Sequence, residues 1–138
     1  AYAAGRCVDD LRAFVATEGH APELARAAGK LLVERGRMRA PAAPFFAKAV
    51  AADKAVCSDP SVAEAVLDAI GQPPHYDNAK AAAELGFGAC YGVLEKALWA
   101  AFYTSGGYES ANLCAGFVQR KAKLTAFQAA YCQDQRAK

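Results

Sequence analysis

Alanine is the residue that most restricts how this chain can fold. It accounts for 35 of the 138 residues, against nine valines, one isoleucine and three threonines. Alanine has the highest intrinsic helix propensity because it loses no side-chain entropy in a helix, whereas strands favour β-branched and aromatic residues. No run of alternating apolar and polar residues is long enough for a strand. The sequence therefore predicts an all-α protein.

Length and charge restrict the class of protein further. A chain of 138 residues fits one compact α-helical domain, residues 1–138. A net charge of +2 with 10% aromatic residues argues against intrinsic disorder and against a strongly basic nucleic-acid-binding chain. No uncharged run approaches the roughly 20 residues that a membrane-spanning helix needs, so we expect no transmembrane segment.

Prolines, glycines and capping residues divide the chain into six or seven helices that form a compact bundle of antiparallel hairpins. We expect helices over about 7–18, from 22 to 35, from Pro41 or Pro44 through Val56, and from 60 to 70. Further helices are expected over 79–104, 109–120 and 125–135.

Two of these boundaries depend on particular capping residues. Asp59 precedes Pro60, a pairing typical of a cap followed by a first-turn proline. The two prolines in 72–78 exclude a helix there, and Asp77 or Asn78 can cap the helix that follows.

The segment 79–104 is the longest and most apolar, and we expect it to be the central buried helix. Gly86, Gly88 and Gly92 each weaken a helix by about 1 kcal/mol relative to alanine. We interpret them as places where another backbone passes close by.

The C-terminal region has two possible arrangements. Thr125 and Gln128 have capping-box spacing, which predicts a break near Lys123 and a separate last helix. One continuous helix over 109–135 is the alternative.

The five cysteines are too far apart in sequence for a metal site, and the two histidines, His20 and His75, supply no such pattern. We therefore expect neither a metal nor a cofactor. The cysteines are Cys7, Cys57, Cys90, Cys114 and Cys132.

We predict that four of them form two disulfides. Cys57 and Cys90 are equidistant from the expected turn at Pro73–Pro74, and Cys114 and Cys132 are equidistant from Lys123. Residues equidistant from the turn of an antiparallel hairpin lie level, where Cα atoms can approach the roughly 5.5–6 Å of a disulfide. Cys7 is then a free thiol or an intermolecular bridge. Five reduced, buried thiols are the alternative.

Disulfides, together with a first residue that is not methionine, favour a secreted or extracytoplasmic location, including an oxidising organelle compartment.

Basic side chains gather in two stretches of the sequence. If the two clusters adjoin in space, they form a surface for acidic partners, phosphate or anionic lipid. Solvated helix faces are the simpler interpretation. The first cluster contains Lys30, Arg35, Arg37 and Arg39, and the second contains Arg120, Lys121 and Lys123.

By residue type, the best catalytic candidates are His75, Tyr76 and Asp77, because a histidine that titrates near neutrality can transfer protons. The alternative is that Asp77 caps a helix, Tyr76 covers the core and His75 is exposed. The sequence contains no nucleophile elbow, phosphate loop or metalloprotease motif.

Aromatic residues are dense over 91–108, where they can line an apolar pocket or contact a partner, with Tyr103 and Tyr108 the candidates for partner contact. We therefore predict a non-catalytic α-helical interaction or ligand-binding protein. It would be a secreted effector or binding protein, or an accessory subunit of a larger assembly, whose partner is a protein or a small apolar ligand. Two alternatives stay open: a small hydrolase-like enzyme using His75, and a carrier of lipid or haem.

Overall fold

The computed structural model describes residues 8–10, 12–13, 22–35, 38–120 and 123–137, and within these residues every regular element is helical. The predicted all-α class is confirmed. The expected helix over 7–18 lies largely outside the described residues, although 8–10 and 12–13 are helical. In chain order the elements are α2 (Pro22–Glu34), α3 (Arg39–Ala52), the 3₁₀-helix η1 (Lys54–Ser58), α4 (Pro60–Ala69), α5 (Asp77–Glu84), the π-helical segment η2 (Leu85–Ala89), α6 (Tyr91–Thr104), α7 (Gly107–Gln119) and α8 (Ala126–Ala137).

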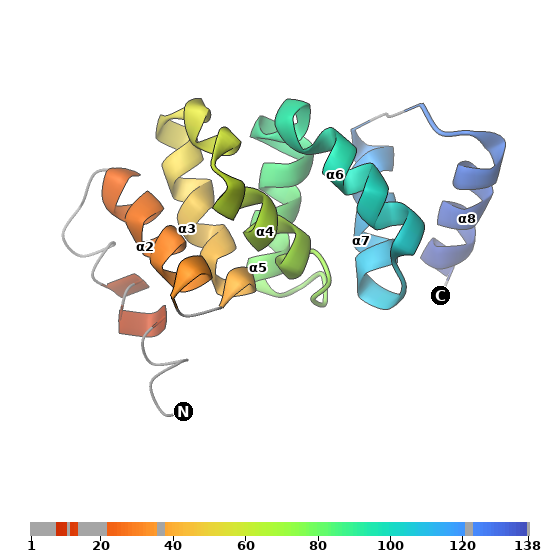
Figure 1. Ribbon diagram of the computed structural model, residues 1–138. Coiled ribbons are helices and arrows are strands. Elements are labelled where there is room, and N and C mark those ends of the chain that lie inside the picture. The colour runs from red at the N-terminus through yellow and green to blue at the C-terminus, as the bar shows by residue number, and fades with distance from the viewer. Residues whose placement is uncertain (1–7, 11, 14–21, 36–37, 121–122, 138) are drawn as a thin grey trace.

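The helices form two groups that differ in how they pack (Figure 1). Helices α2 to α5 lie side by side, with α3 contacting α2, α4 and α5; we call these the alanine half. Helices α6 to α8 form the other end of the molecule, which we call the aromatic half. No helix of the described residues is long and apolar enough to cross a membrane.

Alanines and one glycine bring the helices of the alanine half close together. Helix α3 buries Ala42, Ala43 and Ala49 completely. At Gly29 of α2, an added Cβ would lie 2.8 Å from the Phe46 ring, so the ring of α3 needs a glycine opposite it. Small residues therefore set the spacing of α2 and α3.

Both predicted disulfides are confirmed. Cys57 is bonded to Cys90 with a Cα–Cα distance of 5.3 Å, and Cys114 to Cys132 with 5.2 Å. All four side chains are buried. The first bond joins the two ends of the α4–α5 hairpin and the second joins α7 to α8. Cys7 lies outside the described residues.

The predicted capping box is also confirmed. The Thr125 N–H donates to Gln128 Oε1 (2.9 Å), and the Gln128 N–H donates to Thr125 Oγ1 (3.1 Å). Helix α8 therefore begins at Ala126, and the continuous helix over 109–135 is wrong.

The single helix expected over 79–104 is wrong. The chain forms α5, η2 and α6 there, and Gly88 has the non-helical angles φ −116° and ψ −113°. Gly88 and Gly92 have nothing within 4 Å of an added Cβ, and Gly86 faces the side chains of Val66 and Leu98. No backbone passes close to these glycines. Gly88 instead allows the chain to turn, and α6 buries one face only, through Leu94, Leu98 and Phe102.

Several boundaries differ from expectation by a few residues. Asp59 caps α4 as predicted, accepting the Ser61 N–H at 3.0 Å. Neither Asp77 nor Asn78 caps α5, because Tyr76 occupies the cap position and Asp77 lies in the first turn, near the positive end of the helix.

Helix α3 begins at Arg39, before both prolines that were expected to start it. The Asp68 carboxylate accepts the Ala40 N–H at 3.1 Å and so satisfies one of the free donors of the first turn. The helix ends at Ala52, and Val56 belongs to η1.

Candidate functional site

The loop between α4 and α5 does not assemble a catalytic group. His75, Tyr76 and Asp77 are all exposed, and the His75 and Tyr76 rings meet edge-on with centroids 4.8 Å apart. Within the described residues, no hydrogen bond links the three side chains to one another. A proton-transfer site requires a base that a second group orients toward a cavity, and this loop shows no such arrangement.

The two basic clusters lie at opposite ends of the molecule. Arg35 follows the end of α2, and Arg39 is the first residue of α3. Arg120 and Lys123 lie between α7 and α8 (Figure 1). The condition for one shared basic surface is therefore not met. The remaining members Arg37 and Lys121 fall outside the described residues.

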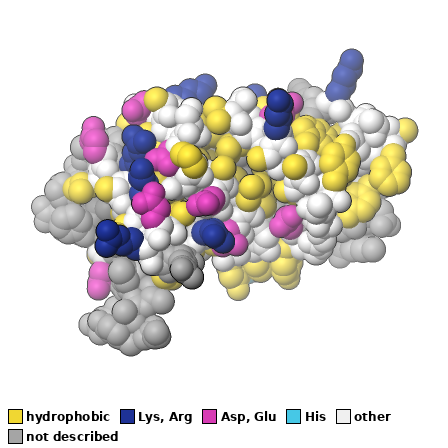
Figure 2. Space-filling model, viewed as in Figure 1, with side chains coloured by type: hydrophobic (Ala, Val, Ile, Leu, Met, Phe, Trp, Pro, Cys, Tyr) yellow, Lys and Arg dark blue, Asp and Glu magenta, His cyan; other side chains and the backbone are white. Residues whose placement is uncertain are grey.

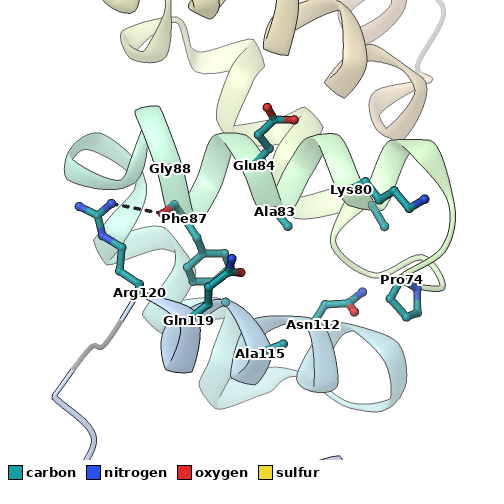
Figure 3. Close-up of a pocket in the computed structure, with 12 residues that line it drawn as sticks. Pro74, Lys80, Ala83, Glu84, Phe87, Gly88, Asn112, Ala115, Gln119 and Arg120 are labelled. Atoms are coloured by element: carbon teal, nitrogen blue, oxygen red, sulfur yellow. Dashed lines mark hydrogen bonds between the residues drawn. The ribbon is translucent and has the colours of Figure 1, made fainter.

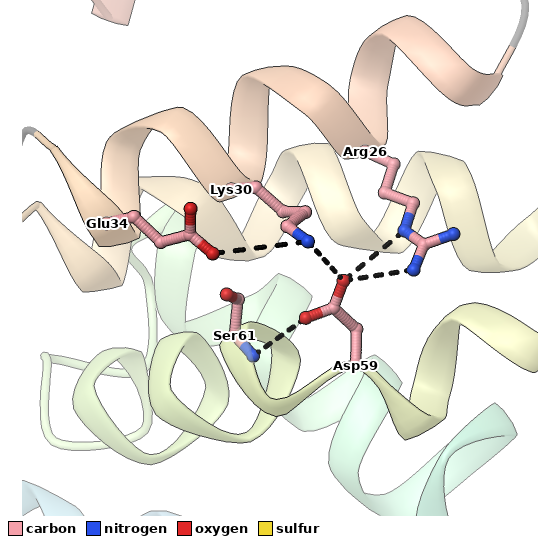
Figure 4. Close-up of polar contacts among 5 residues, drawn as sticks. All are labelled: Arg26, Lys30, Glu34, Asp59 and Ser61. Carbon is pink, nitrogen blue, oxygen red and sulfur yellow. Dashed lines mark hydrogen bonds and ion pairs between the residues drawn. The ribbon is translucent and has the colours of Figure 1, made fainter.

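Lys30 of the first cluster belongs to a charged network around Asp59, whose side chain is only 3% exposed (Figure 4). Asp59 Oδ2 accepts hydrogen bonds from Arg26 Nη2 (3.1 Å) and Nε (3.3 Å) and lies 3.5 Å from Lys30 Nζ. Lys30 also pairs with Glu34 at 4.0 Å.

The network keeps Asp59 ionised. Burial raises the pKa of this carboxyl, but the hydrogen bond from the Ser61 N–H and the two cations outweigh it, so the pKa is lowered from 3.8. Both oxygens are occupied by the protein itself. The network ties α2 to α4 and offers no group to a substrate.

Metal binding has no support in the part of the chain that the structure describes, because no three His, Cys, Asp or Glu side chains there gather closely enough to hold an ion.

Aromatic rings fill the space between α6, α7 and α8. Trp99 stacks on Phe117 with ring centroids 3.8 Å apart, and Phe102 meets Trp99 edge-on at 5.6 Å. Phe102 also meets Tyr131 of α8 at 5.6 Å, and the Tyr131 hydroxyl accepts a hydrogen bond from Ser110 at 3.0 Å. These contacts fix the three helices relative to one another.

Three rings of the aromatic half stay largely exposed, and two of them lie near the start of α8. Tyr103 is 66% exposed and Phe127 is 75% exposed. Gln128 Nε2 donates to the Tyr103 hydroxyl at 2.6 Å, and the same Gln128 completes the capping box that starts α8. We call Tyr103 and Phe127 the aromatic face. Figure 2 shows hydrophobic side chains gathered at this end of the molecule.

Of the two tyrosines predicted to contact a partner, Tyr103 therefore belongs to this face. Tyr108 is 56% exposed at the start of α7.

A groove of about 890 Å³ lies between α5 and α7 (Figure 3). The groove was not predicted from the sequence. Its signal was a set of small residues, with Ala79 and Ala83 one helical turn apart on one helix and the adjacent Ala115 and Gly116 on the other. No feature of the sequence indicated that α5 and α7 face each other. Lys80, Phe87, Asn112, Gln119 and Arg120 also line it.

Comparisons with protein-family models, with curated proteins and with solved structures gave no significant match. The exposed aromatic face and the groove are the two surface features that suggest a function.

Proposed function

We propose that this chain is a non-catalytic binding protein, an effector or an accessory subunit, that contacts a protein partner through its aromatic face. The observation that supports this most is Phe127, a ring 75% exposed at the first turn of α8. Fully burying a phenylalanine side chain contributes about 1.5–3 kcal/mol, which this fold leaves unused.

The fixed position of Tyr103 adds to this argument. Aromatic residues are enriched in the centres of protein interfaces, and rings that are already ordered lose little conformational entropy on binding. The hydrogen bond from Gln128 orders Tyr103 before any partner arrives. The face is thus suited to act as a binding hot spot.

A photo-cross-linking amino acid at position 127 tests this proposal in extracts of the source organism. Position 93 is the matched control, because Val93 is 55% exposed on α6 but is not part of the aromatic face. We expect one discrete protein adduct from position 127 that Tyr103→Ser abolishes, and none from position 93. The same adducts from both positions, or none from position 127, would contradict the proposal.

We also propose a secreted or extracytoplasmic location, including an oxidising organelle compartment. The two buried disulfides support it, since disulfides persist where the environment is oxidising. Alkylation of the native protein at harvest, followed by intact mass measurement, tests it. At most one labelled thiol is expected, from Cys7; five labels would overturn the proposal.

A further inference from the structure

The groove between α5 and α7 is hollow because small side chains face each other across it. Ala83 of α5 and Ala115 of α7 point into the space between the helices (Figure 3). The volume of about 890 Å³ lies within the roughly 300–1,000 Å³ of small-molecule sites.

The floor of the groove is rigid. The Phe87 ring lies over Gly116, where an added Cβ would overlap it, and it meets Phe117 edge-on with centroids 5.0 Å apart. Phe117 is fully buried in the aromatic cluster. The apolar surface that a ligand would cover is therefore formed in advance.

The positively charged side chain of Arg120 is held in place at one end of the groove. Arg120 Nη1 donates to the Phe87 carbonyl at 3.3 Å, and its guanidinium lies 4.3 Å from the centroid of the Tyr91 ring. Within the described residues, Nε and Nη2 of Arg120 have no hydrogen-bond partner. Because Nη1 faces the Phe87 carbonyl, the free edge formed by Nε and Nη2 faces the opposite way, at the outer end of the groove, where it matches a carboxylate (Figure 3).

Two cationic side chains, Lys80 and Arg120, and one carboxylate, Glu84, line the groove. Lys80 lines the groove on α5, while the carboxylate of Glu84 points away from α7 (Figure 3). An anionic group is thus attracted to a groove whose middle is apolar.

We propose that this groove binds an amphiphilic carboxylate of the fatty-acid type. The carboxylate pairs with Arg120 at the outer end of the groove, and the aliphatic chain lies between Ala83 and Ala115, against the small part of Phe87 that is exposed. This site is separate from the aromatic face, so it gives the chain a ligand in addition to its proposed partner.

Calorimetric titration with dodecanoate and with 1-dodecanol, both below their aggregation concentrations, tests the pairing. We expect dodecanoate to bind the wild type at least 10-fold more tightly than dodecanol does. Arg120→Gln should weaken dodecanoate binding about 10-fold, the size of one lost charge-assisted hydrogen bond, and leave dodecanol unchanged. Arg120→Lys should fall between the two, because it keeps the charge but not the planar edge.

A larger side chain in the groove tests whether the ligand binds there. Ala115→Leu should weaken both ligands at least 10-fold, whereas Ala100→Leu, on an exposed position of α6, and Arg35→Gln should change neither. Thermal unfolding checks that each variant is folded. Absence of dodecanoate binding to the wild type, or equal affinity in folded Arg120→Gln, would overturn the proposal. Phe127→Ser should bind dodecanoate normally, which separates this site from the aromatic face.

Discussion

The two halves of this molecule pack their helices with residues of different size. In the alanine half, helices approach closely and each contact is small, as at Ala43 and Ala49. In the aromatic half, α6, α7 and α8 are held apart and large rings such as Phe117 and Trp99 fill the gap. Stability in the first half is distributed over many positions, and in the second it is concentrated in a few.

The halves share one continuous buried core, which includes Val66 of α4 and Leu98 of α6. Asn112 of α7 donates to the carbonyls of Ile70 and Gln72 at the end of α4, both at 2.8 Å, and Phe87 rests on Gly116. The groove lies along this junction. Because the core is shared, site-resolved measurements are needed to compare the two halves.

The largest effect is expected from Phe117→Ala. This ring is fully buried and stacks on Trp99, and removing a buried phenylalanine costs about 3–5 kcal/mol. Urea unfolding followed by Trp99 fluorescence measures the loss. Phe127→Ala, at an exposed ring, is the control and should cost under about 0.5 kcal/mol. Similar losses in both variants would show that the cluster does not concentrate stability.

The disulfides come next. Their sequence separations of 33 and 18 residues predict losses of about 4 kcal/mol for Cys57→Ala with Cys90→Ala, and about 3 kcal/mol for Cys114→Ala with Cys132→Ala. Amide hydrogen exchange locates the effect. The second variant should lose protection in α8 and keep it in α3. Loss of protection throughout the alanine half would contradict this local effect of the second bridge.

Ala43→Leu tests the close packing of the alanine half. Its Cβ is fully buried in α3, so a larger side chain should destabilise the fold by about 2 kcal/mol through overpacking. Ala100→Leu on α6 makes the same change at an exposed position and should be nearly neutral. Denaturant midpoints compare the two, and equal values would mean that the helices of this half can move apart freely.

The smallest effect concerns Asp59. Because the fold lowers its pKa from 3.8, the ionised carboxylate stabilises the protein fully above pH 3.8, and this contribution is lost as the pH falls through the lower, folded value. Asp59→Ala should cost about 1–2 kcal/mol at pH 7.

Asp59→Asn keeps a capping oxygen and removes the charge, so it serves as the matched variant. It should cost less than Asp59→Ala and flatten the decline of stability below pH 4. If stability declines below pH 4 in both variants as it does in the wild type, other carboxylates are responsible for the decline.

The sequence predicted helix starts and disulfides well, because the residues involved have a limited set of structural roles. Proline after Asp59 could only begin a helix, and Thr125 with Gln128 formed the expected pair of hydrogen bonds. Hairpin symmetry found both disulfides, because level positions on neighbouring helices follow from the helix repeat alone.

It was less informative where tertiary contacts decide. Glycine occurs both where another backbone passes close by and where the chain turns. Gly88 was expected to mark a close backbone, but it marks a turn. The groove depends on which helices face each other, and the arrangement of Ala83 opposite Ala115 is set by the packing of the aromatic cluster. Periodicity within one helix contains no such information.

The order of the sulfur bonds along the chain has one further consequence. The loops closed by Cys57–Cys90 and Cys114–Cys132 follow one another without overlapping. A protease cutting once between residues 90 and 114 would therefore release two pieces, each with its own bridge intact and neither tied to the other by sulfur.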